Sequence, residues 1–225
     1  MKNKNMRKIY YALPLILILI SSGCSSDDNN GPMEEDNPII IARTAIPDVM
    51  FERALIELNL DDVEDGSVLT SSIENIADLI IEDKGITNLS GIEDFTSLVG
   101  LWARDNMLAT LNVSKNSNLK FVIAPNNLLT VLNVSNLSML ERIQVENNGL
   151  AQLNISANTA LQQLSLANNS LLAIDISNIP SLIQLNTFSI ENNPLDCIQV
   201  NAEQFNNIPS QWTKDETDTY ALECN

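Results

Sequence analysis

The chain of 225 residues contains no histidine. Without histidine, neither a Ser–His or Cys–His nucleophilic pair nor a histidine metal site can form. Its 29 acidic residues are scattered and show no paired-acid motif of the kind used in glycoside hydrolysis. The sequence therefore predicts that the protein is not an enzyme and that it holds no cofactor and no metal.

Basic residues are also scarce, with 12 Lys and Arg against 29 Asp and Glu and a net charge of −17. Phosphate contacts need clustered Lys and Arg, so nucleic-acid binding is disfavoured. Attachment to a membrane through a basic patch is disfavoured for the same reason. Acidity of this strength keeps an exported protein soluble but does not identify a partner.

Long hydrophobic runs are absent too. The apolar run at 9–20 has about 12 residues, fewer than the ~20 that a membrane-spanning helix needs. Basic residues precede it, and the small residues 21–23 lead into Cys24. This arrangement resembles the lipobox of bacterial lipoproteins, although Ser21 stands where that family usually has leucine. The resemblance implies a signal peptide at 1–23 and lipidation of Cys24, with plain secretion as the alternative.

Removal of residues 1–23 would leave 8 basic and 29 acidic residues, a net charge of −21. Residues 24–38 have too few apolar side chains to fold and predict a disordered tether. The Ser and Asp run after the cysteine resembles the surface-export signal of outer-membrane lipoproteins in the Bacteroidota. That resemblance implies a protein anchored in the outer membrane by its lipid and exposed on the cell surface.

Only three cysteines are present. If Cys24 carries lipid, Cys197 and Cys224 remain, and an exported compartment permits a disulfide between them. The bond would close a loop of about 27 residues and contribute roughly 3–4 kcal/mol. Two unpaired thiols are the alternative.

What the chain does contain is a repeat of 21 residues with apolar side chains at positions 1, 4, 6, 11, 14 and 16 and asparagine at position 9. A variant copy precedes the regular ones at 76–97, and a shifted copy follows them after an insertion of three residues near Leu182. This period and the pattern L-x-x-L-x-L-x-x-N-x-L predict a leucine-rich-repeat solenoid of six coils over 76–200. Such a fold displays a surface instead of building a catalytic pocket. The regular copies are 98–118, 119–139, 140–160 and 161–181.

Each coil should begin with a short strand in which positions 4 and 6 point inward. Successive strands would then form one parallel β-sheet on the concave face. The recurring L-N-V-S of the second half predicts coil or short strand on the convex face, with few helices. The position-9 asparagines should point inward and bond backbone groups where the chain turns. They are Asn106, Asn127, Asn148, Asn169 and Asn193.

Residues 39–75 are expected to form an N-terminal cap with a helix at about 47–58 that covers the open end of the solenoid. The Pro–Asp start of this helix resembles the caps of internalin-like repeat proteins. Residues 201–225 are expected to form an irregular C-terminal cap. The apolar stripe of the helix would be Ile46, Met50 (or Phe51), Ala54 and Leu58.

Two further motifs favour structural roles. The acidic segment 61–66 resembles a calcium loop, but Val63 and Ser72 occupy ligand positions, so a solvated turn is predicted. The N-x-[ST] motifs recur with the repeat, which favours a structural role over glycosylation. Over about 46–225, the chain resembles the leucine-rich-repeat lipoproteins of the Bacteroidota, a family whose fold does not specify one function.

Strand positions 3, 5, 7 and 8 would face the concave side. They bring Trp102, Phe121 and Ile123 together as a solvent-exposed cluster, and exposed aromatic clusters mark interfaces. If the cap or tether covers the cluster, or the register slips by one residue, the cluster is not a site. A charged rim would surround it, made of Glu82, Asp83, Arg104, Asp105 and Arg142. The ligand-binding candidates are Trp102, Phe121, Ile123, Arg104 and Arg142.

The sequence thus favours a lipid-anchored, monomeric binding module of the cell envelope whose concave face engages a protein. One alternative is a structural or assembly lipoprotein that packs laterally in the envelope. Another is a glycan-binding surface lipoprotein that uses the same aromatic cluster.

Overall fold

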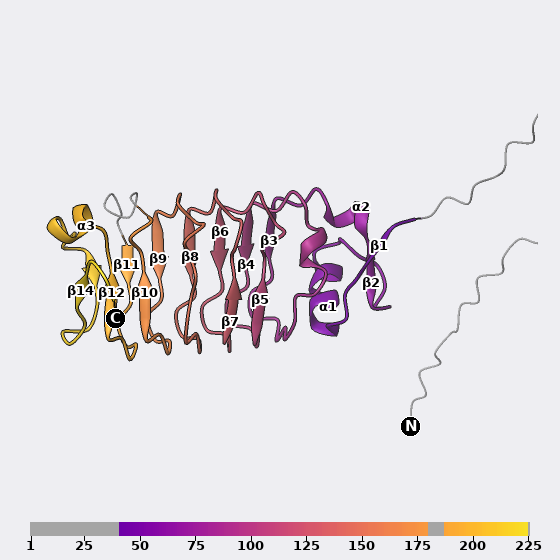
Figure 1. The fold of residues 1–225 in the computed structure, drawn as a ribbon. Helices are drawn as coiled ribbons and strands as arrows, with labels where there is room; N and C mark the ends of the chain where they lie inside the picture. The colour runs from indigo at the N-terminus through magenta and orange to yellow at the C-terminus, as the bar shows by residue number, and fades with distance from the viewer. Residues whose placement is uncertain (1–40, 180–186, 225) are drawn as a thin grey trace, which may run out of the picture. The chain divides into compact units, whose positions relative to one another are not determined.

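A computed structural model describes residues 41–179 and 187–224, which form a parallel β-solenoid (Figure 1). The expected signal peptide, Cys24 and the tether at 24–38 lie outside the described residues, as does Leu182. In chain order the elements are β1 (Arg43–Ala45), α1 (Val49–Glu57), β2 (Ser67–Leu69), α2 (Thr70–Ile73), β3 (Asp78–Ile80), η1 (Ile92–Asp94), β4 (Gly100–Trp102), β5 (Thr110–Asn112), β6 (Phe121–Ile123), β7 (Val131–Asn133), β8 (Arg142–Gln144), β9 (Gln163–Ser165), β10 (Ala173–Asp175), β11 (Thr187–Ser189), β12 (Cys197–Gln199), α3 (Ala202–Asn206), β13 (Trp212–Thr213) and β14 (Tyr220–Ala221).

The main sheet has seven strands in the order β13-β11-β9-β8-β6-β4-β3, and all of its pairings are parallel. Six of these strands open the six predicted coils, so the predicted solenoid and its parallel sheet are confirmed. Arg142 pairs with Gln163, 21 residues later, whereas Gln163 pairs with Thr187. The second step is three residues longer, which confirms the predicted shift of the last coil.

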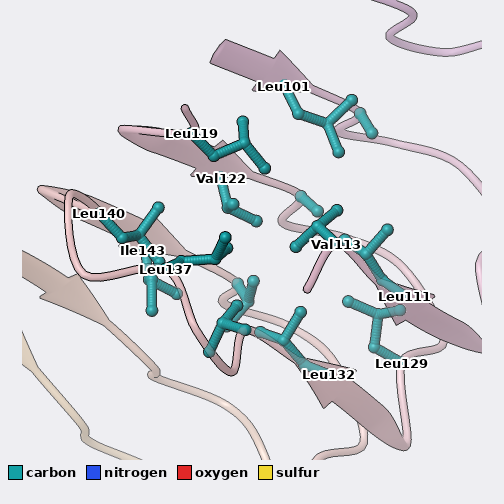
Figure 2. Close-up of a cluster of buried hydrophobic side chains, with 14 of the residues drawn as sticks. Leu101, Leu111, Val113, Leu119, Val122, Leu129, Leu132, Leu137, Leu140 and Ile143 are labelled. Carbon is teal, nitrogen blue, oxygen red and sulfur yellow. The ribbon is translucent and has the colours of Figure 1, made fainter. Parts of the chain in front are cut away.

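Leucine, isoleucine and valine side chains fill the space between the two walls of each coil (Figure 2). Position 4 shows how the repeat builds this core, because Leu101, Val122 and Ile143 lie in register on adjacent strands and are fully buried. Each such side chain contributes about 1.5–3 kcal/mol on burial. The apolar positions of the repeat are therefore what stacks one coil on the next.

The second halves of the coils form two smaller parallel sheets, β5-β7 and β10-β12-β14. Between them, the corresponding segment 152–154 of the fourth coil pairs with neither neighbour. The sequence predicted coil or short strand on the convex face, and both occur there: segment 152–154 is irregular, whereas 110–112 and 131–133 are short strands. The convex wall of the described residues is thus interrupted at its middle.

Inward-pointing asparagines join the coils, as predicted. The Asn127 amide nitrogen donates to the carbonyl oxygens of Ala103, Ala124 and Pro125 at 2.9, 3.2 and 3.2 Å. Its side-chain oxygen accepts from the Leu108 backbone N–H at 3.0 Å. One amide therefore satisfies four backbone groups of two adjacent coils, which explains why a polar residue is stable there. The same bonds recur at Asn106, Asn148, Asn169 and Asn193.

The residue before each of these asparagines has a left-handed backbone, with φ between 55° and 58°, and Asp83, which precedes Lys84 at the same place in the first coil, has φ 53°. Asn and Asp tolerate this conformation better than other residues with a side chain. Adjacent side chains also bond each other, because the Asn126 amide donates to Asp105 and the Asn147 amide donates to Asn126, both at 2.7 Å. The position-8 residues are Asp83, Asp105, Asn126, Asn147, Asn168 and Asn192.

The N-x-S motifs form tight local turns. The side-chain oxygen of Asn112 accepts from the backbone N–H and the hydroxyl of Ser114, at 3.2 and 2.9 Å. Asn154 makes the same two bonds to Ser156. The structural interpretation of these motifs is therefore confirmed.

At the N-terminal end, helix α1 begins after Asp48 and lies within the range expected for it. Its apolar stripe follows the prediction at Ile46, Phe51 and Ala54, which are buried, and of the two alternatives Met50 is the exposed one. The prediction is wrong for Leu58, which is 41% exposed, whereas Leu55 is fully buried. Phe51 stacks on Phe95 of the first coil at 6.2 Å between ring centroids.

The C-terminal end is more regular than the expected irregular cap. Strand β13 extends the main sheet, β14 extends the second sheet, and helix α3 joins the two walls. Cys197 of β12 is bonded to Cys224 across 5.9 Å between Cα atoms, which confirms the predicted disulfide. In the part of the chain described, no helix has the length and apolar character to cross a membrane.

Candidate functional site: the outer face of the main sheet

The outer face of the main sheet is the face that turns away from the core, the one expected to be concave. Strand register places Trp102, Ile123 and Gln144 side by side in one row of this face, and Phe121 and Arg142 in the next row. The register is the predicted one, without a slip. The structure therefore brings Trp102, Phe121, Ile123 and Arg142 together as expected.

Three of the candidates form a continuous stack across strands β4, β6 and β8. The ring centroids of Trp102 and Phe121 are 6.3 Å apart, and the Arg142 guanidinium carbon lies 5.5 Å from the Phe121 ring centroid. Both contacts are in the range of favourable aromatic and cation–π geometry. All three residues are half-buried, so the stack still presents area to solvent.

Gly100 provides the seat for the Trp102 indole. A Cβ atom at Gly100 would lie 2.1 Å from two carbons of the indole's six-membered ring and 2.9 Å from a carboxylate oxygen of Asp78. Contacts this short do not occur, so the ring can lie over the backbone of β4 only because residue 100 has no side chain. The backbone of a single glycine thus sets the position of the main aromatic residue of the site.

Ile123 corrects the prediction of a fully exposed cluster. Its side chain is only 8% exposed although it lies on the outer face and outside the buried core cluster. It stands between Trp102 and Gln144 in the register, so side chains flank it on both sides. Ile80, beside Trp102 in the same row, is 56% exposed and is the more accessible apolar side chain.

Beside the stack the face is hollowed by a groove of about 630 Å³, which we call the outer-face groove. Trp102 forms part of one wall, and Ile123 and Pro125 are apolar lining residues. The polar lining residues are mainly amides and carboxylates. The residues that line the groove are Glu82, Trp102, Arg104, Ile123, Pro125, Asn126, Gln144, Glu146, Asn147, Ala167 and Asn168.

The charged candidates differ in what they can offer a ligand. Arg104 forms an ion pair with Asp105 at 3.2 Å, so its charge is already balanced. Arg142 takes part in none of the ion pairs between described residues, and its Nε atom is buried without a hydrogen-bond partner. The Arg142 guanidinium is thus a cation of this face that stays available for an acceptor on a ligand.

Sequence reasoning missed the groove residues from positions 5, 7 and 8 of the third to fifth coils. Gln144, Glu146 and Asn147 line the groove but were not among the candidates. The available signal was the pattern of the repeat itself, since Glu82 and Glu146 occupy the same position 7 of different coils. The sequence placed positions 5, 7 and 8 on this face, but which of their residues line a groove depends on how the coils stack.

A second hollow, of about 410 Å³, lies where the convex wall is interrupted at 152–154. Its walls combine Leu132 and Ile174 with polar side chains such as Gln199. None of the residues proposed from the sequence for ligand binding lines it. Within the described ranges, no three His, Cys, Asp or Glu side chains are grouped so that they could hold a metal ion. The geometry of the outer face, an aromatic stack beside a groove, is suited to binding a ligand on its surface.

Comparison with protein-family models and with curated proteins finds no match. Among solved structures, the chain is similar to the functional domain of InlJ from Listeria monocytogenes, which includes a cysteine ladder. The TM-score is 0.61 at 22% identity over 82% of this chain and 49% of that one. The chain thus spans about half the length of the InlJ domain, and the likeness shows that it has the leucine-rich-repeat fold of the internalins.

Two other internalins of Listeria monocytogenes are more distant in structure. Internalin C2 has a TM-score of 0.45 at 19% identity, over 81% of this chain and 99% of that one. The internalin InlF has a TM-score of 0.39 at 17% identity, over 79% of this chain and 71% of that one.

Proposed function

We propose that this leucine-rich-repeat protein is a non-enzymatic binding module that engages a protein through the outer face of its main sheet. The observation that carries the proposal is the half-buried stack of Trp102, Phe121 and Arg142 beside a groove of about 630 Å³. Trp, Tyr and Arg are the residues that most often dominate binding energy at protein interfaces. The leucine-rich-repeat fold supports the proposal because its successive strands present one continuous surface.

The geometry of this face supports binding of a protein ligand better than it supports a purely structural role. A surface that only packs laterally needs no recessed groove, whereas a groove with an aromatic wall and polar side chains provides both contact area and orientation. A glycan would also use Trp102 and the amides of the groove. It remains the second candidate, supported by Gln144, Asn147 and Asn168.

We further propose that the chain is anchored in the outer membrane through lipid on Cys24 and faces the cell exterior as a monomer. The lipobox-like residues before Cys24 and the acidic tether support this location. The test is labelling of intact producing cells with an impermeant biotin reagent, for wild type and a Cys24→Ala variant. Labelled wild type and a released variant support the anchor, and an unlabelled membrane-bound wild type contradicts surface exposure.

The binding face is tested with Trp102→Ala and with Gly100→Ala, which keeps the indole but displaces it from its seat. Both variants should bind a protein partner of the wild-type chain at least tenfold more weakly, because truncation of a hot-spot residue costs about 2 kcal/mol or more. Affinity is measured by biolayer interferometry with the full chain. Phe205→Ala serves as the matched control, since this aromatic side chain is 47% exposed on α3, away from the main sheet.

The outcomes separate the candidate functions. Lost affinity with an unchanged melting temperature supports the protein-binding face. Equal affinity of both variants and wild type contradicts it, and a loss of envelope integrity in cells lacking the protein would then favour the structural role. A defined glycan that binds wild type but not Trp102→Ala would favour the glycan-binding alternative.

A further inference from the structure

The outer-face groove has an excess of negative charge. Glu82 and Glu146 line it and are half-buried, and no hydrogen bond or ion pair from another described residue engages their carboxylates. The one cation that lines the groove, Arg104, is balanced by Asp105 at 3.2 Å. Two uncompensated carboxylates in a recess therefore favour a ligand that carries positive charge.

Trp102 adds a second reason for a cationic ligand. Its indole is half-buried, lies over Gly100 near the Asp78 carboxylate, and lines the same groove as Glu82. The face of an indole carries negative electrostatic potential and attracts ammonium and guanidinium groups within about 6 Å. An aromatic face and free carboxylates that line one groove favour the side chain of a lysine or an arginine.

The spacing of the two carboxylates fits an extended peptide. Glu82 and Glu146 follow strands β3 and β8 at the same register position, three strand spacings apart. At about 4.8 Å per spacing, their backbones are roughly 14 Å apart. An extended chain advances about 3.4 Å per residue, so residues i and i+4 span nearly the same distance and point to the same side.

The side chains between the carboxylates suit the middle of such a segment. Pro125 lies between the two carboxylates in the same row and offers apolar contact to a residue at i+2, whereas Ile123 is nearly covered. Arg104, the other residue of that row, is paired with Asp105. The backbone groups of the main sheet are already paired, so the segment would not add a strand. Gln144 and Asn147 present amide groups that can instead donate to and accept from its backbone.

We infer that the outer-face groove takes an extended protein segment with two basic side chains four residues apart and an apolar side chain between them. This inference rests on the proposed function and names the chemistry of its partner. The acidic character of the whole chain, with a net charge of −17, assists the approach of such a segment.

The test uses three synthetic peptides and the full chain. The first contains Lys-Ser-Leu-Ser-Lys, the second Glu-Ser-Leu-Ser-Glu, and the third has the lysines adjacent as Lys-Lys-Ser-Leu-Ser. Binding is followed by tryptophan fluorescence, which reports on the groove because Trp102 is half-exposed and the second tryptophan, Trp212, is only 6% exposed. The first peptide should bind with the highest affinity, and more weakly as the salt concentration rises.

A double variant removes the two charges without changing side-chain size. Glu82→Gln with Glu146→Gln should weaken binding of the first peptide about three- to tenfold, as expected for two partly exposed ion pairs. Glu216→Gln is the matched control, because this exposed carboxylate lies outside the groove, and it should leave affinity unchanged.

The inference is overturned if the first peptide does not bind, if the acidic peptide binds as well, or if the double variant binds like the control. The proposed function is judged separately, by the effect of Trp102→Ala on affinity for the protein partner. A partner that still depends on Trp102 would then show that the face binds a protein of other chemistry. A partner that does not depend on Trp102 would remove both proposals.

Discussion

One asparagine in each of the last five coils replaces the backbone partners that are lost where the strand of the main sheet ends. Asn127 engages four backbone groups belonging to two adjacent coils and is nearly buried. Its amide is both a donor and an acceptor, which neither a hydroxyl nor a carboxylate can reproduce with the same geometry. The identity of this residue is therefore a condition of the fold and is independent of any ligand.

Asn127→Ala should lower the free energy of unfolding by about 2–4 kcal/mol, because it leaves several buried backbone groups without partners. Chemical denaturation followed by circular dichroism measures the change. The matched control is Asn118→Ala, since Asn118 is exposed and its side chain makes a single bond, to the Thr96 carbonyl. Equal effects of the two variants would contradict the role assigned to the inward asparagine.

At the scale of elements, one carboxylate both caps helix α1 and bonds it to the first coil. One oxygen of Asp48 accepts from the backbone N–H groups of Met50 and Phe51 and caps the helix, at 2.9 and 3.0 Å. The other accepts from the Thr87 hydroxyl at 2.6 Å and from the N–H groups of Thr87 and Asn88. A helix cap and a contact between elements thus depend on the same side chain.

These bonds give the stability of the cap a defined pH dependence. Burial by itself raises the pKa of Asp48, but the bonds from Thr87, Phe51 and Asn88 outweigh it and hold the pKa below its ordinary value of 3.8. A lowered pKa means that the stabilisation is present above about pH 4 and is lost as the pH falls through the lowered value. The folded cap should therefore loosen in acid as this carboxylate becomes protonated.

Asp48→Ala should cost about 2 kcal/mol at pH 7, from the lost helix cap and the lost bonds to the coil. The difference in unfolding free energy between variant and wild type should shrink as the pH falls from 5 to 2. Urea denaturation at a series of pH values measures it. As the control, Asp62→Ala removes an exposed carboxylate near the same cap and should show neither effect. A difference that stays constant over this range would refute the assignment.

At the scale of the whole molecule, the stability of the solenoid depends on how its two ends are covered. At the C-terminal end, β13 and β14 continue the two walls, and the Cys197–Cys224 disulfide ties the end of the chain to β12. Trp212 packs on Phe188 with ring centroids 5.2 Å apart, so an aromatic residue closes the core at this end. Open ends of a solenoid expose core side chains, and this arrangement covers them.

Removal of the disulfide by Cys197→Ser with Cys224→Ser should lower the unfolding free energy by roughly 3–4 kcal/mol, as expected for a closed loop of 27 residues. Differential scanning calorimetry with and without reductant measures the effect. Reductant should lower the melting temperature of wild type and leave that of the double variant unchanged. If wild type melts at the same temperature in both conditions, the bond does not contribute to stability.

The sequence by itself determined the number of coils, the core positions, the inward asparagines and the shift of the last coil. The physical reason is that each coil contacts mainly its neighbours, so one period of 21 residues carries most of the packing information. A residue such as Asn127 or Leu101 is explained within a coil and the one beside it. This is why the parallel sheet and the register of Trp102 with Ile123 could be predicted.

Only the tertiary structure decided which side chains and backbone segments meet on the two faces of the solenoid. Ile123 is covered by its neighbours, the Trp102 indole rests on Gly100, and segment 152–154 leaves the convex wall unpaired. The first and the last depend on side chains or backbones about 21 residues apart that meet laterally, and the pattern within one coil does not specify such contacts. The Gly100–Trp102 contact lies within one strand and depends on the direction that the indole takes. The groove that carries the proposed function is a product of these lateral contacts, so it could be found only once the coils were stacked.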